Sequence, residues 1–178
     1  MNNYAVVLYF DEASHRRLSE MMEALVQCGV NAYMIDHQIP PHVTLSLFGC
    51  ERIEPVIDRL EAHAATLAAG KIAWASLGAF VPRVLFAASV MSDYLLGLCR
   101  AVNDLLAPIT IPGDEGHYLP NRWVPHAALA VRMTQPELSA AFEAASKRFA
   151  AFVGEANRLA LVRCDPYTQI KTWHLPES

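Results

Sequence analysis

Apolar and polar residues follow one another along the chain in patterns that predict an alternation of strands and helices. Short runs that are continuously apolar or alternate with period two predict strands at 4–10, 42–48, 71–80, 83–89, 126–131, 157–164 and 168–174. Apolar residues at helical spacing predict helices that begin near Asp11, Pro55, Ser92 and Thr134. Prolines and glycines predict a long loop at 109–122, a length that is often functional.

The predicted elements form two similar series. Strand, helix, strand, helix and strand follow one another in the first half, and the same order returns in the second half. No low-complexity linker separates the halves, so a single bilobal domain is expected over residues 1–178. The expected fold class is α+β. It should contain two pseudo-symmetric lobes, each a largely antiparallel sheet with helices packed outside, and a cleft between the lobes.

A short motif is repeated at matching points of the two series. Pro41-His42-Val43-Thr44-Leu45 returns 84 residues later as Pro125-His126-Ala127-Ala128-Leu129. In a strand with regular alternation, His42, Thr44 and Ser46 share one face. Three polar groups on one face and three aliphatic groups on the other indicate a strand that lines a cleft with its polar side.

Two histidines on equivalent strands of facing halves can act as a general base and a general acid. Histidine has an ordinary pKa of about 6.5, so it serves in either role near neutral pH. A hydroxyl one strand step beyond each histidine, on the same face, would donate to an oxygen that carries negative charge in a bound substrate. Thr44 meets this requirement, and Ser46 is a further candidate. We therefore predict that His42 and His126 are a catalytic acid–base pair, with Thr44 and Ser46 as substrate-binding residues.

The second motif has Ala128 where the first has Thr44, so one hydrogen-bond donor is missing. The predicted loop before this motif holds two residues that could replace it, Tyr118 and Arg122. Arg122 offers a fixed charge and a fork of donors. Both are therefore predicted substrate-binding residues.

The paired motifs, together with Trp123-Val124-Pro125-His126, resemble those of the 2H phosphoesterase superfamily, which includes 2'-5' RNA ligases and cyclic phosphodiesterases. The resemblance implies that both histidines lie in a cleft between two lobes. It also implies hydrolysis of cyclic phosphates or phosphodiesters on nucleotides or RNA ends, or joining of RNA ends through 2'-5' linkages. Members of this family use no metal and no cofactor, so none is expected here.

Charge and composition narrow the choice of partners. The net charge of -4 and the pI near 5.9 disfavour broad binding to nucleic-acid backbones, so a small nucleotide or cyclic phosphate is expected before RNA ends. No apolar run reaches about 20 residues, and no secretory signal is visible, so no membrane partner is expected. The four cysteines lack metal-binding spacing, which favours free thiols in the cytoplasm. The sequence carries no signal for a particular oligomeric state.

Several alternatives remain open at this point. The missing donor at Ala128 also fits a non-catalytic or weakly active module that binds phosphate or nucleotides, and an RNA 2'-5' ligase is a further possibility. His37 is a candidate for substrate contact, and His117 near Asp114 and Glu115 is a candidate metal group. Core packing or stacking on a base are the two interpretations of the aromatic residues Tyr33, Trp123 and Trp173.

Overall fold

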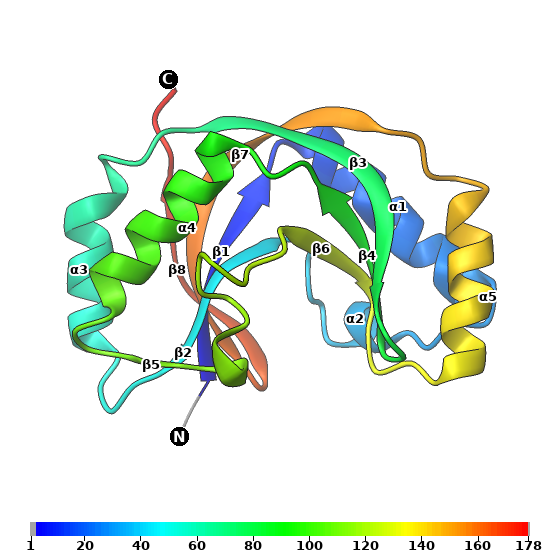
Figure 1. The fold of residues 1–178 in the computed structure, drawn as a ribbon, viewed down its shortest axis with the longest axis horizontal. Coiled ribbons are helices and arrows are strands. Elements are labelled where there is room, and N and C mark those ends of the chain that lie inside the picture. The colour runs from blue at the N-terminus through cyan, green and yellow to red at the C-terminus, as the bar shows by residue number, and fades with distance from the viewer. Residues whose placement is uncertain (1–2, 178) are drawn as a thin grey trace.

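The computed structural model describes residues 3–177 and contains strands and helices in close alternation (Figure 1). The strands are β1 (Asn3–Phe10), β2 (Val43–Gly49), β3 (Gly70–Phe80), β4 (Val84–Ser89), β5 (Ile111–Pro112), β6 (His126–Ala130), β7 (Phe152–Cys164) and β8 (Tyr167–His174). The helices are α1 (Glu12–Gln27), α2 (Tyr33–Asp36), α3 (Glu54–Ala64), α4 (Asp93–Leu106) and α5 (Gln135–Ser146), with a 3-10 turn at Asp114–Gly116. This is the α+β class predicted from the sequence.

All paired strands run antiparallel, and their order reveals an internal symmetry. The sheet has the order β5-β2-β1-β7-β3-β4-β6, and β8 pairs with β7. Exchanging β1 with β4, β2 with β6 and β3 with β7 turns the order β2-β1-β7-β3-β4-β6 into the same order read from the other end. The two series found in the sequence are therefore related by a pseudo-twofold arrangement. We call β5, β2 and β1 the first half-sheet, and β3, β4 and β6 the second half-sheet.

The two half-sheets are joined through β7. One edge of this strand pairs with β1 along 156–163, and the other pairs with β3 along 152–156. The sequence predicted that this strand begins at residue 157, but it begins at Phe152. Gly154 interrupts the apolar pattern there, so the start of the strand gives no clear signal in the sequence. The structure favours glycine at this position because a Cβ atom would lie 1.8 Å from the Ser14 Oγ. The sequence predicts two sheets, whereas the structure has one continuous sheet because β7 pairs with a strand of each half-sheet.

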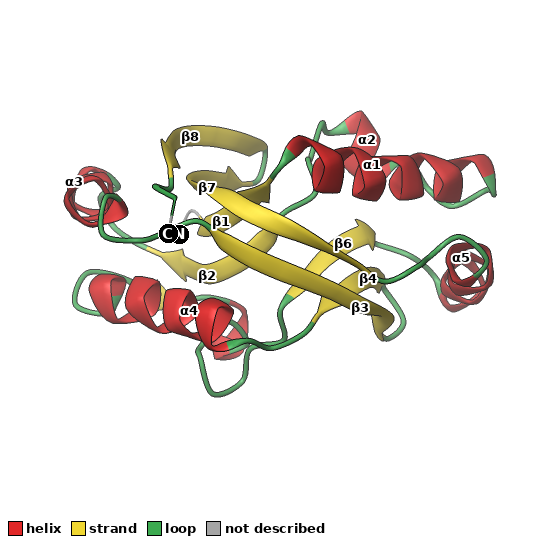
Figure 2. Cartoon of the chain, turned by 90° about the horizontal axis from the view of Figure 1, so that it is seen from above, coloured by secondary structure: helices red, strands yellow, loops and turns green. Residues whose placement is uncertain are grey.

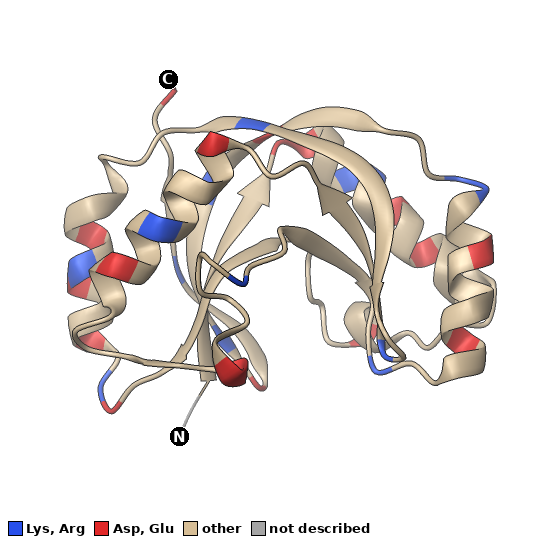
Figure 3. Ribbon diagram, in the orientation of Figure 1, with Lys and Arg blue, Asp and Glu red and all other residues tan. Residues whose placement is uncertain are grey.

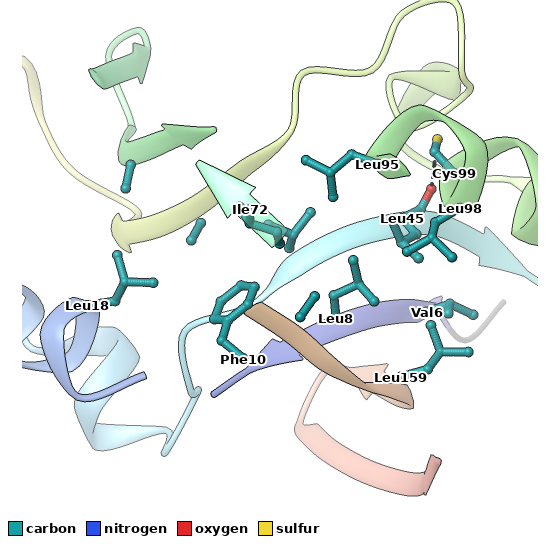
Figure 4. Packing of buried hydrophobic residues seen from close by; sticks show 14 of the residues in the cluster. Val6, Leu8, Phe10, Leu18, Leu45, Ile72, Leu95, Leu98, Cys99 and Leu159 are labelled. Carbon is teal, nitrogen blue, oxygen red and sulfur yellow. Dashed lines mark hydrogen bonds between the residues drawn. The ribbon is translucent and has the colours of Figure 1, made fainter. Parts of the chain in front are cut away.

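The helices cover the outer side of the arched sheet. Helices α3 and α4 lie beside the first half-sheet, and α1 and α5 lie beside the second (Figures 1 and 2). One apolar core runs between helices and sheet, and its fully buried members include Leu8, Phe10, Leu45, Ile72 and Leu95 (Figure 4). Burial of this continuous surface is the main stabilising contribution to the fold.

Local sequence signals fix the helix starts as expected. The Asp11 carboxylate accepts from the Ser14 backbone N–H at 2.9 Å, and the Ser92 hydroxyl accepts from the Leu95 N–H at 3.2 Å. Thr134 and Glu137 form the predicted capping box. Three short elements were not predicted: α2, and both β5 and the 3-10 turn inside the predicted loop. Each has too few residues to show a period. No helix within residues 3–177 is long and apolar enough to cross a membrane.

Candidate active site

Strand β2 carries the first motif and contains a bulge in its middle. Val6 of β1 pairs with Ser46, and the next residue, Val7, pairs with Thr44, so Leu45 has no partner on β1. The bulge reverses the alternation after Thr44. Thr44 stays on the concave face, whereas Ser46 turns toward the helices. The prediction that His42, Thr44 and Ser46 share a face is therefore wrong for Ser46.

Strand β6 carries the second motif and contains a bulge at the equivalent position. Leu85 of β4 pairs with Ala130, and Phe86 pairs with Ala128, so Leu129 has no partner. The leucine that ends each repeated motif is therefore the bulged residue in both. The repeat in the sequence encodes one backbone geometry built twice.

The two imidazoles are held by the same local hydrogen bond. His42 Nδ1 lies 2.8 Å from the Pro40 carbonyl oxygen, and His126 Nδ1 lies 2.7 Å from the Val124 carbonyl oxygen. Because a carbonyl can only accept, Nδ1 carries the proton in both rings. In the neutral rings, Nε2 is therefore unprotonated and able to exchange protons with a substrate.

Both histidines line one cavity of about 660 Å³ between the two half-sheets. His42, which directly precedes β2, and Thr44 of β2 enter it from the first motif, and His126 and Ala128 of β6 enter it from the second. Its remaining walls come from α2 and its following loop, from the hairpin of β3 and β4, from the loop before β6 and from the residue that follows β6. Those wall residues are Met34, Ile39, Phe80, Val81, Arg83, Val84, Asp114, His117, Tyr118, Arg122, Trp123, Val124 and Val131.

Burial lowers the pKa of both catalytic candidates. The pKa of His42 falls from 6.5 to about 4, chiefly because burial disfavours the charged ring; the Pro40 hydrogen bond opposes this, and the positive charge of His126 adds to it. The pKa of His126 is also lowered by burial, against the Val124 hydrogen bond. The charge of His126 acts on His42 across the cavity that both rings line. Both are neutral at pH 7 in the free protein.

A buried indole ties the two motifs together. Trp123 lies three residues before His126, and its Nε1–H donates to the Thr44 carbonyl at 2.9 Å. The side chain is buried among core residues. Of the two interpretations of Trp123, core packing is the one that the structure supports, and the hydrogen bond also fixes the first motif against the second.

Ser46 belongs to a polar network under the bulge. It is 4% exposed, and its hydroxyl donates to Asn103 Oδ1 of α4 at 2.9 Å. Asn103 Nδ2 donates to the Leu45 carbonyl at 3.0 Å and to the Tyr118 carbonyl at 3.3 Å. The Asn103 amide therefore links the bulged residue of β2 to the loop before β6. Ser46 is not among the residues that line the cavity, and we leave it out of the candidate site.

The loop before β6 brings the other predicted residues to the cavity. Tyr118 lies 6.3 Å from the His126 ring between centroids, and burial raises its pKa to about 12. Arg122 is exposed, and its Nη1 donates to the Glu115 carbonyl at 2.7 Å. His117 Nδ1 lies 3.6 Å from Asp114 Oδ2 at the same cavity. Within residues 3–177, no group of three His, Cys, Asp or Glu side chains is arranged to hold a metal ion.

The remaining aromatic and histidine candidates lie elsewhere. Tyr33 stacks on His37 with centroids 4.0 Å apart and receives the Arg132 guanidinium at 3.9 Å. His37 does not line the cavity. Trp173 is buried, and its Nε1–H donates to Glu61 Oε2 at 2.7 Å. Tyr33 and Trp173 are not among the residues that line the cavity.

Sequence reasoning missed three residues of this region. The sequence pattern places Phe80 and Phe86 in strands and gives them no further role, yet the centroids of their rings lie 4.9 Å and 5.0 Å from that of His126. Asn103 was passed over as a helix residue. Its position four residues after Cys99, on the apolar face of α4, was a usable signal, because a polar side chain among buried ones needs a partner.

Comparison with protein families gives the class of the chain. The model of the 2'-5' RNA ligase superfamily matches residues 13–167, which is most of the chain and includes both motifs. The protein therefore belongs to the 2'-5' RNA ligase superfamily, as the resemblance of its motifs implied. A comparison with curated protein sequences gives no significant match.

Solved structures with the same fold include proteins of bacteria and of a yeast. TT0787 of Thermus thermophilus has a TM-score of 0.62 and 21% identity, with 99% of each chain covered. E. coli LigT in complex with 3'-AMP has a TM-score of 0.59 and 13% identity, with 98% of each chain covered. Kluyveromyces marxianus Usb1 has a TM-score of 0.50 and 12% identity, with 98% of each chain covered. At these identities the likeness concerns the fold.

Proposed function

We propose that this protein is a metal-independent phosphoesterase that hydrolyses a 2',3'-cyclic nucleotide, a related cyclic phosphate or an RNA-end phosphodiester. His42 and His126 act as the general acid and base pair. The observation that carries the proposal is that both imidazoles line one cavity, each with its Nδ1–H held by the carbonyl two residues earlier. Two Nε2 atoms are thereby left for proton transfer on either side of a phosphate.

Two proton transfers accomplish the reaction. The neutral Nε2 of one histidine takes a proton from water as the water oxygen bonds to phosphorus. The protonated Nε2 of the other gives its proton to the departing sugar oxygen as the phosphorus–oxygen bond breaks. The pair ends with its protonation states exchanged, and proton exchange with solvent resets them. Because a bound phosphate is negative, it favours the imidazolium form that burial suppresses in the free protein.

Thr44 and Arg122 stabilise the charge on the phosphate. The Thr44 hydroxyl lies on the concave face with His42 and donates to a non-bridging oxygen. Arg122 supplies a positive charge and further donors from the opposite wall once it leaves its contact with the Glu115 carbonyl. Tyr118 lines the same wall and keeps its proton, so its hydroxyl is a further donor.

Nucleotides are the favoured substrates for two reasons. Solved complexes of E. coli LigT contain 3'-AMP, ATP, NADP+ and phosphate, and LigT shares the fold at full length. In this chain, Lys and Arg are interspersed with Asp and Glu along the helices (Figure 3), and the net charge is -4. A small anion is therefore a better match than a long polyanion. The buried free thiols Cys50 and Cys99 support a reducing compartment, for which we propose the cytoplasm.

The residue at 128 favours a second candidate function. Ala128 lines the cavity beside His126 and has no donor, so a module that binds phosphate or nucleotides without turnover also accounts for the site. Joining of RNA ends through a 2'-5' linkage is the same opening of a cyclic phosphate at the same histidines, with the 5'-hydroxyl of an RNA in place of water and the 3' oxygen as the leaving group. The family includes such activity, and this makes it the third candidate.

A substrate panel separates these functions. Purified protein in EDTA is offered 2',3'-cyclic mononucleotides, an RNA with a 2',3'-cyclic phosphate end alone, and the same RNA with a 5'-hydroxyl partner strand. We expect hydrolysis of the mononucleotides by the wild type and none by His42→Ala. Binding of the mononucleotides without turnover would favour the module, and a joined product would favour the ligase. Turnover only after addition of a divalent metal would overturn the proposal.

A further inference from the structure

The wall around His126 is aromatic. The rings of Phe80, Phe86 and His126 contact one another, with centroids 4.5 Å apart for Phe80–Phe86, 4.9 Å for Phe80–His126 and 5.0 Å for Phe86–His126. Among residues 3–177, His42 instead lies beside the ring of Tyr167, at 5.8 Å between centroids. The two histidines therefore meet the cavity from environments of different chemistry.

Two small residues make room for this aromatic wall. Phe86 pairs with Gly78 on one side and with Ala128 on the other, in the middle of β4. A Cβ atom at Gly78 would lie 2.4 Å from Phe86 Cε2, so the ring rests directly on the glycine backbone. Ala128 contributes no polar group to the same face. The loss of the hydroxyl in the second motif and the presence of the rings are thus parts of one apolar surface.

Phe80 carries this surface into the cavity. It is 41% exposed although it lines the site, and its neighbours on the cavity wall include Val81, Val84 and Val124. An exposed aromatic ring inside a cavity binds another planar ring by stacking or edge contact. A phosphate, by contrast, gains nothing from an apolar wall.

We propose that Phe80 and the apolar wall around it form the subsite for a planar heterocyclic ring of the substrate, namely a nucleobase. The phosphate is then held from the first motif and the Arg122 loop. This inference rests on the proposed function, because it assigns the ends of the substrate to the two halves of that cavity. Phe80 is therefore a specificity-determining residue.

The test compares substrates with and without a base. Wild type and Phe80→Ala are assayed with adenosine 2',3'-cyclic phosphate and with methyl riboside 2,3-cyclic phosphate, which lacks the base. Phe80→Ala should raise KM about tenfold for the nucleotide and leave KM for the base-free compound unchanged. Phe80→Trp should keep or lower the nucleotide KM. Phe142→Ala is the matched control, since Phe142 is 43% exposed on α5 and does not line the cavity.

Binding measurements make the test independent of turnover. Calorimetry with adenosine 3'-monophosphate and ribose 3-phosphate compares the same pair of ligands in all variants. Equal loss for both ligands in Phe80→Ala would mean that Phe80 only supports His126, and this would overturn the inference. If neither cyclic phosphate is turned over, the proposed function fails. Selective loss of the adenosine compound would still establish the base subsite.

Discussion

The two halves of the site share a backbone and differ in the groups that it displays. In both, an x-Pro-His segment bonds the imidazole Nδ1 to the carbonyl two residues earlier, and the leucine of the motif is bulged. In the first half, the concave face then presents the hydroxyl of Thr44. In the second half, it presents the methyl group of Ala128 beside two phenylalanine rings.

The difference extends beneath the strands. Asn103 lies ten residues after the first residue of α4, and the residue at the same offset in α1 is Met22. Ser46, which bonds to Asn103, corresponds in the repeat to Ala130. Three polar residues of the first half thus have apolar counterparts in the second. The repeat preserves the hydrogen bonds and bulges that position the two imidazoles. The residues around the imidazoles differ between the two halves.

The largest expected effect comes from the feature that the halves share. His42→Ala and His126→Ala should each lower kcat by about 10²–10⁴, because each removes one of two linked proton transfers. The kcat of the double variant should be only slightly lower than that of the less active single variant, since the two histidines act as a unit. Steady-state kinetics with a cyclic nucleotide measure this, and His63→Ala on α3 is the control. Retained activity in either single variant would refute the symmetrical use of the two motifs.

The pH dependence of the rate should show that the pKa values of both imidazoles are lowered. Burial lowers the pKa of His42 to about 4 and also lowers that of His126, and activity needs one ring neutral and one protonated. The maximum of kcat/KM, which reports the free enzyme, should therefore lie below pH 6.5 and decline about tenfold per pH unit well above it. The kcat profile should lie at higher pH, because bound phosphate stabilises the imidazolium. A kcat/KM maximum at pH 7.5 would contradict this.

Removal of the hydroxyl at position 44 tests the polar half alone. Thr44→Val keeps the shape of the side chain but not its donor, and it should lower kcat by about 10². Thr44→Ser keeps the hydroxyl and should retain most of the rate. Parallel assays of the two variants separate hydrogen bonding from packing. If both variants are equally impaired, Thr44 acts through packing, and the phosphate contact must come from another group.

The sequence predicts the features that the two halves share better than the residues in which they differ. Periodicity and caps located the main elements, and the repeat brought His42 and His126 to one cavity, because these signals are local. Ser46 was misplaced because a bulge reverses alternation without any mark in the sequence. Phe80 and Phe86 were missed because their contacts with His126 depend on the pairing of β4 with β6, and these two strands are far apart along the chain.

The network beneath the first bulge gives a prediction about stability. Asn103→Ala should lower the free energy of unfolding by about 2–3 kcal/mol, since it leaves the Ser46 hydroxyl buried without its partner and leaves the Leu45 carbonyl with only the Cys99 thiol, at 3.5 Å. Ser46→Ala, which copies the second half, should cost about 1 kcal/mol. Urea unfolding followed by circular dichroism measures both. If Asn103→Ala costs no more than Ser46→Ala, the Cys99 thiol suffices for the Leu45 carbonyl and the Asn103 amide does not hold the bulge.

The smallest expected effect comes from making the second half resemble the first. Ala128→Thr places a hydroxyl on the cavity face beside His126, and a β-branched residue suits a strand, so the fold should accept it. One added hydrogen bond to phosphate should contribute about 1 kcal/mol, measured as roughly fivefold tighter binding of inorganic phosphate. Ala128→Val adds the same bulk without a donor and is the matched control. If threonine and valine act alike, the second half does not touch the phosphate, and its apolar wall serves the remainder of the substrate. If threonine alone tightens binding, the phosphate spans both motifs, and Ala128 marks a contact that this chain has given up.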